Sequence, residues 1–150
     1  MSNFERDVIF AELGEEKAWW KMVNSPKTKS VLDVRKDGFF QEKDIDFLQQ
    51  TVDGKVNKIE VKSDRQAHET RNIVYETVSN GNTGCLLRSN ADYVYYYFTE
   101  SNEVYLISMN ALRWYVSHTM LNTVRMGDGA EGYLINIDDL VESKVAICMK

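Results

Sequence analysis

A β-hairpin centred on Asp53-Gly54 constrains the fold of this chain more than any other feature. Asp-Gly between two short runs that contain apolar residues is a strong signal for a tight turn joining antiparallel strands. The run before the turn contains Asp44-Ile45-Asp46-Phe47-Leu48, and the run after it contains Ile59-Glu60-Val61-Lys62. We therefore expect these two runs to pair in one sheet.

Charged side chains of this hairpin are expected to meet on one face. Alternate residues of a strand point to the same side, so Glu60 and Lys62 share a face while Ile59 and Val61 pack behind them. Pairing of the two strands brings Asp46 toward Glu60. Two carboxylates on one face can bind a hard divalent cation such as magnesium. Lys62 can orient a water that attacks a phosphate or, as the neutral amine, deprotonate it.

This arrangement resembles the PD-(D/E)XK nuclease superfamily, in which an Asp, then Glu-x-Lys on the next strand, hold metal and catalyse phosphodiester hydrolysis. Asp46, Glu60 and Lys62 occupy the corresponding places. Ile45 stands where the family pattern has Pro, as in the branch that resembles archaeal Holliday-junction resolvases and related phage enzymes. Asp44 shares the face of Asp46 and is the alternative. We prefer Asp46 because it directly precedes an apolar strand, as the family pattern requires.

The resemblance implies a fold, a cofactor and a ligand set. The fold is α/β, with a restriction-endonuclease-like core in which helices flank a central mixed β-sheet. The cofactor is Mg²⁺ or Mn²⁺. Its expected ligands are the carboxylates of Asp46 and Glu60 and the backbone carbonyl of Val61.

A glutamate on the first helix is also expected at the site, because nucleases of the resolvase-like branch carry one that reaches the metal. The segment Phe4 to Val23 has apolar residues at helical spacing and is predicted to be an amphipathic helix. The predicted apolar stripe contains Phe4, Val8, Ile9, Leu13, Trp19, Trp20 and Val23. Glu12 falls inside this stripe and is the expected site residue, with Glu16 as the alternative.

Three further residues are candidate accessory members of the site. Arg71 to Glu76 is predicted to be a strand, and a strand ending in Glu resembles a phage and mobile-element subgroup of these nucleases. Functional groups cluster at the ends of such elements, so Glu76 is one candidate. Asp64 and Gln66, which closely follow the Glu-x-Lys strand, are the others. This resemblance covers about residues 40 to 110.

The rest of the chain also fits an α/β fold. Tyr93 to Phe98 is a continuous aromatic run typical of a strand buried on both faces, and Glu103 to Ser108 is expected to pair with it. A helix is predicted from Ser108 or Asn110 to Met120. Further strands are predicted at Ser30 to Val34 and Tyr133 to Ile137, a loop at Met126 to Gly132, and a terminal turn at Asp138-Asp139.

Composition sets the outer bounds. With 150 residues and 43% hydrophobic content, the chain is long enough for one well-cored domain, residues 1–150, and too short for two of ordinary size. It shows no apolar run near 18 residues and no leader pattern, so we expect no membrane association and a cytoplasmic location. Cys85 and Cys148 lack zinc-site spacing and are expected to be reduced core residues.

The net charge of −5 argues against simple DNA binding through a basic surface. Basic residues nevertheless surround the hairpin and are predicted to form a local basic rim. They are Lys55, Lys58, Lys62, Arg65 and Arg71.

Two functions from different classes remain. The first is a metal-dependent DNA endonuclease, for which a resolvase-like activity on branched DNA would require a homodimer that cuts two strands. The second is a nuclease-like fold used as a non-catalytic binding or inhibitor protein of a phage or mobile element, which the acidic balance would suit. The intact Asp and Glu-x-Lys set favours the enzyme.

Overall fold

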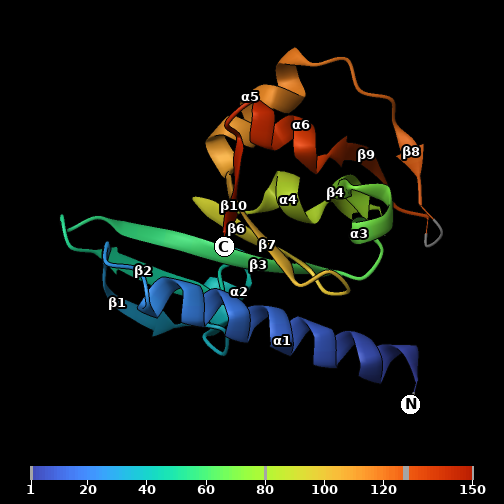
Figure 1. The fold of residues 1–150 in the computed structure, drawn as a ribbon. Helices are drawn as coiled ribbons and strands as arrows, with labels where there is room; N and C mark the ends of the chain where they lie inside the picture. The colour runs from blue at the N-terminus through green and yellow to red at the C-terminus, as the bar shows by residue number, and fades with distance from the viewer. Residues whose placement is uncertain (1, 80, 127–128, 150) are drawn as a thin grey trace.

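The computed structural model describes residues 2–79, 81–126 and 129–149. Within them the chain forms a six-stranded mixed sheet, in the order β1-β2-β3-β6-β7-β10, and a four-stranded antiparallel sheet, in the order β5-β4-β9-β8 (Figure 1). The strands of the first sheet are β1 (Thr28–Asp33), β2 (Phe47–Thr51), β3 (Val56–Asp64), β6 (Tyr93–Phe98), β7 (Glu103–Ser108) and β10 (Ala146–Met149). Those of the second are β4 (Asn72–Ser79), β5 (Asn82–Thr83), β8 (Val124–Arg125) and β9 (Glu131–Asn136).

The helices lie on both sides of the six-stranded sheet. They are α1 (Asn3–Val23), α2 (Gly38–Gln41), α3 (Ala67–Thr70), α4 (Cys85–Arg88), α5 (Met109–His118) and α6 (Ile137–Glu142). Helix α1 runs along one face, while the second sheet and helices α4 to α6 stand over the other (Figure 1). The expected α/β architecture, a central mixed sheet flanked by helices, is confirmed, and the second sheet is an addition that the sequence did not predict.

The predicted hairpin around Asp53-Gly54 is confirmed. Strands β2 and β3 pair antiparallel, with Phe47 opposite Ile59 and Leu48 opposite Lys58. Gly54 adopts a φ of +90°, a left-handed conformation that glycine reaches without steric cost. Strand β2 begins at Phe47, because Asp44 itself has a φ of 57° and belongs to the turn that precedes the strand.

The aromatic strand β6 is buried on both faces, as predicted. Tyr95 and Tyr97 pack into the hydrophobic cluster under α1, whereas Val94, Tyr96 and Phe98 pack into the cluster between the two sheets. Strand β6 pairs antiparallel with β7, also as predicted, and parallel with β3. This parallel pairing connects the hairpin to the larger core.

Helix α1 confirms the predicted helix, but its buried face differs from the prediction. Its N-terminus is fixed by a capping box between Ser2 and Glu5. The buried residues are Gly14, Ala18 and Met22, while six members of the predicted apolar stripe are exposed. These six are Phe4, Val8, Ile9, Leu13, Trp20 and Val23. The prediction was wrong because small residues, and not large ones, allow the helix to approach the sheet closely.

The C-terminal part departs from the predictions in three places. Strand β9 already begins at Glu131, inside the predicted loop, of which residues 127 and 128 lie outside the described residues. Helix α6 follows where a turn was predicted, with Asn136 accepting hydrogen bonds from the amides of Asp138 and Asp139 as its N-cap. Strand β10 then adds an edge to the six-stranded sheet. The prediction of a core Cys148 was wrong, because this cysteine is exposed on β10, and the side chain of Cys85 lies outside the described residues.

The described helices include none that is both long enough and apolar enough to span a membrane.

The close approach of α1 to β3 yields a first prediction. A Cβ atom at Gly14 would lie 2.0 Å from Ser63 Oγ, a buried hydroxyl that has no hydrogen-bond partner among the described residues. Gly14→Ala is therefore expected to lower the free energy of unfolding by about 1–2 kcal/mol, although alanine in an open helix would raise it by about 1 kcal/mol. Ser63→Ala removes the clashing atom, so the double variant should recover the loss in urea denaturation. A single Gly14→Ala variant that is more stable than wild type would contradict this packing.

Candidate active site

Asp46 is held against β3 by its backbone and its side chain together. Its amide donates a hydrogen bond to the carbonyl of Ile59 at 2.8 Å, and its Oδ2 accepts one from the amide of Val61 at 2.7 Å. The carboxylate therefore lies beside the central strand at the point where the Glu-x-Lys segment begins. Strand pairing fixes this position, since β2 starts at the next residue.

Glu60 and Lys62 share one face of β3, as predicted. Their partners on β6 are Val94 and Tyr96, which both belong to the hydrophobic cluster between the sheets. The Glu60 residue is only 3% exposed, and its Oε1 lies 3.2 Å from Lys62 Nζ. A buried carboxylate with a cation beside it is costly to place in a core unless the pair has a function or further partners.

A hollow of about 280 Å³ opens at this point of the sheet. Its lining includes Asp46, Glu60, Val61 and Lys62, and the others are Arg35, Gln41, Asp44 and Ile45. The structure thus brings together the predicted metal ligands and the predicted catalytic lysine around one cavity.

Asp46 has a perturbed acidity. Burial raises the pKa of Asp46 from 3.8 to about 6, and the negative charges of Glu15 and Glu60 add to this rise. The hydrogen bond from Val61 and the charge of Lys62 act in the opposite direction. A carboxyl group destabilised by burial and by like charges is typical of a site that binds a positive ion.

The helix glutamate with an electrostatic effect on this site is Glu15. Its negative charge contributes to the raised pKa of Asp46, and its carboxylate forms an ion pair with Arg35 at 2.5 Å. Arg35 also lines the hollow. Glu12 and Glu16 are exposed and line a neighbouring hollow together with Glu15. None of Glu12, Glu15 and Glu16 lines the cavity of Asp46 and Glu60. The apolar pattern gave no reason to choose Glu15, because it placed a different face of α1 toward the sheet.

The alternative ligand Asp44 lies at the hollow but is paired with an arginine, whereas the accessory candidates lie outside it. Asp44 forms an ion pair with Arg88 at 3.0 Å, at the rim of the hollow. Asp64 accepts hydrogen bonds from the Tyr96 hydroxyl at 2.9 Å and from the amide of Gln66 at 2.8 Å, which closes the turn after β3. Glu76 lies on β4 in the second sheet. Neither Asp64 nor Gln66 nor Glu76 lines the hollow.

The expected basic rim is only partly present. Arg65 pairs with Asp7 of α1 at 2.7 Å, and Arg71 pairs with Glu103 and Asp138 at 2.9 and 2.8 Å. These two arginines therefore tie elements of the fold together and do not belong to a rim around the hairpin. From the predicted set there remain Lys55, at the exposed turn of the hairpin, Lys58, on β3, and Lys62, which lines the hollow beside Glu60.

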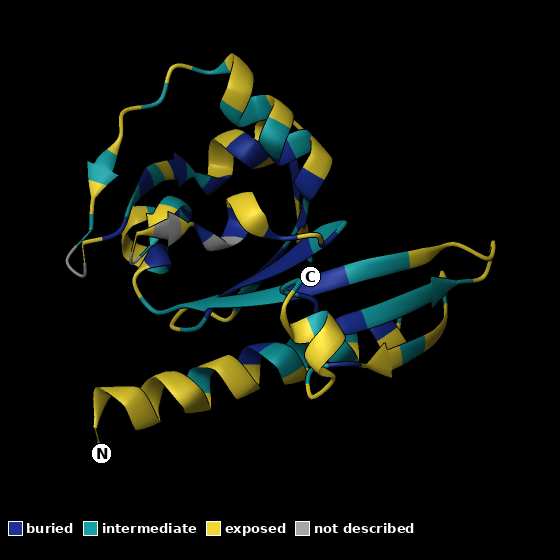
Figure 2. Ribbon diagram, turned by 180° about the vertical axis from the view of Figure 1, so that it is seen from behind, coloured by how far each residue is buried: buried dark blue, intermediate teal, exposed yellow. Residues whose placement is uncertain are grey.

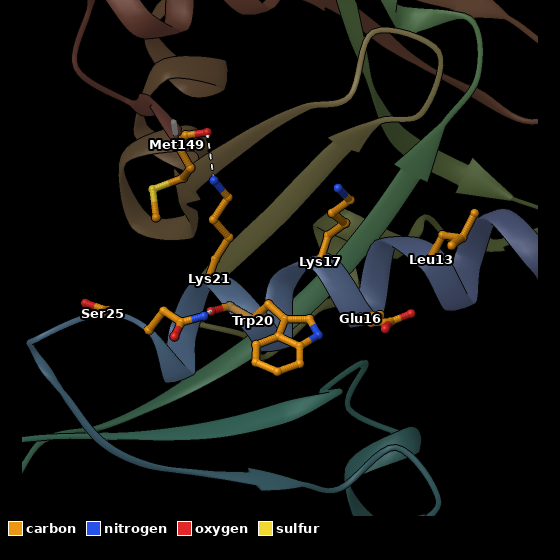
Figure 3. Close-up of a pocket in the computed structure, with 8 residues that line it drawn as sticks. Leu13, Glu16, Lys17, Trp20, Lys21, Ser25 and Met149 are labelled. Atoms are coloured by element: carbon orange, nitrogen blue, oxygen red, sulfur yellow. Dashed lines mark hydrogen bonds between the residues drawn. The ribbon is translucent and has the colours of Figure 1, made fainter.

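A second and wider cavity, of about 710 Å³, lies between the end of α1 and β10 (Figure 3). Lys21 reaches across it and donates a hydrogen bond to the carbonyl of Met149 at 3.4 Å. Trp20 and Leu13 give it an apolar lining, and Glu16 is its single carboxylate among the described residues. Because the described residues that line this wider cavity include no pair of acidic groups, metal-assisted chemistry is better supported at the hollow of Asp46 and Glu60.

The donor atoms of the smaller hollow suit magnesium. Across the described residues, no group of three or more His, Cys, Asp or Glu side chains is arranged to hold a metal ion. The expected ligands in this hollow, the carboxylates of Asp46 and Glu60 and the Val61 carbonyl, offer oxygen donors only, and Asp44, a third carboxylate of the lining, pairs with Arg88. Magnesium is commonly bound by one or two carboxylates, with water and substrate phosphate completing its shell. The residues present therefore fit this ion, and they lack the nitrogen and sulfur donors that zinc prefers.

The fold resembles that of one known class of protein. A solved structure of a bacterial homing endonuclease, I-Ssp6803I, matches this structure with a TM-score of 0.50 and 17% sequence identity, covering 85% of this chain and 76% of that chain. At this identity the likeness shows a shared fold. No protein-family model and no curated protein matches the sequence.

The raised pKa of Asp46 predicts how stability depends on pH. A carboxyl group with a pKa of about 6 in the folded chain, against an ordinary value of 3.8, favours folding at low pH, and this contribution is lost as the pH rises through 6. Asp46→Asn keeps the shape and the hydrogen bond from Val61 but removes the charge. In metal-free buffer at pH 7.5, it should raise the free energy of unfolding by about 1–3 kcal/mol, with little change at pH 3.5. Equal effects at the two pH values would show that Asp46 is not destabilised by burial.

Proposed function

We propose that this protein is a metal-dependent DNA endonuclease that hydrolyses phosphodiester bonds. The observation that carries the proposal is the convergence of Asp46, Glu60, Val61 and Lys62 around one hollow at the start of β3. The resemblance of these residues to the PD-(D/E)XK pattern and the fold shared with a homing endonuclease support it.

Each residue has a distinct role in the proposed reaction. The carboxylates of Asp46 and Glu60, with the carbonyl of Val61, would hold Mg²⁺ or Mn²⁺. A bound ion of this kind supplies positive charge that polarises the scissile phosphate and acidifies the attacking water. Lys62, held beside Glu60, orients that water and offsets the negative charge that develops on the phosphate. Burial of Glu60 keeps this carboxylate in one position before substrate arrives.

The helix contribution is assigned to Glu15. Its negative charge raises the pKa of Asp46, and its carboxylate pairs with Arg35, a residue that lines the hollow, so in this proposal it acts on the site through that ion pair. In this proposal Glu15 replaces Glu12, which was the expectation from sequence.

Loss of either metal-binding carboxylate should abolish cleavage. Glu60→Gln and Asp46→Asn preserve shape but delete charge that the cation needs. We expect both variants to fold and to lose cleavage of duplex, single-stranded and branched DNA in the presence of Mg²⁺ or Mn²⁺, measured by gel electrophoresis of labelled substrates. Metal-dependent cleavage by both variants at wild-type rates would refute the proposal.

Lys62 should affect the chemical step and not metal binding. Lys62→Met keeps most of the apolar stem and removes the ammonium, so magnesium affinity by calorimetry should persist or rise slightly. Single-turnover cleavage at saturating DNA should fall by about 10²- to 10⁴-fold, the usual contribution of a positioned acid–base or electrostatic group. A normal rate would reduce Lys62 to a structural partner of Glu60.

Three of the glutamates of α1, Glu12, Glu15 and Glu16, provide a matched test of the helix contribution. Glu15→Gln should lower the pKa of Asp46, because it removes a negative charge that raises it, and should slow cleavage at saturating metal. Glu12→Gln and Glu16→Gln, which alter exposed residues of the same helix, should leave both properties unchanged. The pH profile of cleavage reports the first effect. A defect in Glu12→Gln alone would restore the original sequence-based assignment.

A further inference from the structure

The face of the six-stranded sheet that carries Glu60 is covered over only part of its width. On β6 and β7 this face packs against the second sheet and helices α5 and α6. On β1, β2 and the first half of β3, no described layer covers it, and these strands project beyond the upper layers as a ribbon (Figures 1 and 2). The opposite face of the same strands is covered by α1. The candidate active site lies at the boundary between the covered and the uncovered part.

Strand register places six side chains on this uncovered face, which we call the open ribbon face. They form two rows across the three strands. The first row is Ser30, Gln50 and Val56, and the second row is Leu32, Leu48 and Lys58. Exposure agrees with this assignment, since Leu32 is 60% and Val56 is 55% exposed.

The open ribbon face lies next to the candidate site along β3. Lys58 precedes Glu60 by two residues on β3, and alternate residues of a strand share a face. The segments that precede β2 and β6, the two neighbours of β3, meet between this face and the hollow, where the Asn90 amide donates to the Lys43 carbonyl at 3.2 Å and Asp44 pairs with Arg88 at 3.0 Å. A ligand on this face would therefore lie beside the site and reach Lys62 past this contact.

The charge of the open ribbon face differs from that of the whole chain. None of its six residues is acidic and Lys58 is basic, whereas the chain as a whole has a net charge of −5. The acidic residues of α1 lie on the layer that covers the opposite face of these strands, and they include Glu5, Asp7, Glu12, Glu15 and Glu16. A polyanion can therefore approach the ribbon from its open side without meeting those carboxylates.

We propose that the open ribbon face binds in the major groove of duplex DNA and reads its sequence, with Gln50 as the specificity-determining residue. The inference rests on the proposed function for the class of ligand. The major groove is about 12 Å wide and admits two adjacent strands, which lie about 4.8 Å apart, and β-ribbons are an established means of reading it.

Gln50 has the chemistry and the position for direct readout. Its carboxamide can donate and accept at once, the pattern that matches the N7 and N6 positions of adenine. The Ser30 hydroxyl donates to Gln50 Oε1 at 3.3 Å, which orients the carboxamide and leaves a second lone pair on that oxygen. Val56, opposite Gln50, lies four residues from Glu60, about 13 Å along the strand. At about 3.4 Å per base pair, we expect the base read by Gln50 about four base pairs from the cleaved bond.

Gln49 provides a matched control for this residue. It is the neighbouring glutamine on the same strand, but it points to the α1 side, where its Nε2 donates to Thr28 Oγ1 at 2.7 Å. Gln50→Ala and Gln49→Ala thus remove the same side chain from opposite faces of one strand.

The test uses a pool of duplex DNA with randomised sequence and the full-length wild type, Gln50→Ala and Gln49→Ala proteins. Cleaved ends are sequenced after incubation with Mg²⁺ or Mn²⁺, and DNA retained by the proteins in EDTA is sequenced in parallel. We expect a base preference in wild type that Gln50→Ala weakens about tenfold to a hundredfold at one position, while Gln49→Ala retains it. Thermal unfolding of all three proteins checks that the variants are folded.

The outcomes separate this inference from the proposed function. If wild type cleaves no DNA but the retained pool shows a preference that Gln50→Ala loses, the ribbon reads DNA and the nuclease proposal fails. Cleavage without base preference, or a preference that both variants keep, overturns the ribbon inference while the nuclease proposal stands. A pool with neither cleavage nor enrichment overturns both.

A second copy of the chain is the competing occupant of the open ribbon face. Sedimentation of wild type and Leu32→Glu distinguishes it, because Leu32 is the most exposed of the apolar residues on this face. Similar monomeric sedimentation of both proteins is expected. A dimer that Leu32→Glu dissociates would assign the face to self-association and overturn the DNA-reading role.

Discussion

The candidate site depends on one constraint, the burial of two carboxylates beside each other where β2 pairs with β3. Strand pairing fixes both groups through the backbone, because Asp46 is anchored by amide hydrogen bonds on either side of Glu60. The Asp46 carboxylate cannot move away from β3 without losing the hydrogen bond from Val61. The positive charge of Lys62 offsets part of this repulsion, and a cation would offset more.

Strand β3 also explains why the site lies where it does. Its first half pairs with β2 in the projecting ribbon, and its second half pairs in parallel with β6 in the main core. Glu60 and Lys62 are therefore held by a rigid core on one side and open to a ligand on the other. Rigid elements position reacting groups more accurately than loops do, which suits a site that must hold a cation and a phosphate together.

The sequence predicted those elements whose signals are local. The Asp53-Gly54 turn set the hairpin, the aromatic run set β6, and both strand pairs formed as expected. The shared face of Glu60 and Lys62 followed from simple alternation along β3. These predictions succeeded because turn chemistry and side-chain period act over a few residues.

What sequence could not supply was the outcome of tertiary packing. Glu12 and Glu16 of α1 were the expected site residues, and whether either one faces the site depends on which face of the helix docks. Gly14 and Ala18 decide this by permitting close approach, a preference that hydrophobic periodicity does not detect. The second sheet was missed for a related reason, since β4 finds its partner β9 about 60 residues later in the chain.

That long separation has a consequence for synthesis on the ribosome. At about 5–20 residues per second, β4 emerges about 3–12 s before the strand that pairs with it. During this interval Ile73 and Tyr75, both fully packed in the finished protein, lack the β9 side of their core. The nascent chain therefore carries an unpaired apolar strand for several seconds, a state in which chaperone binding or aggregation competes with completion of the fold.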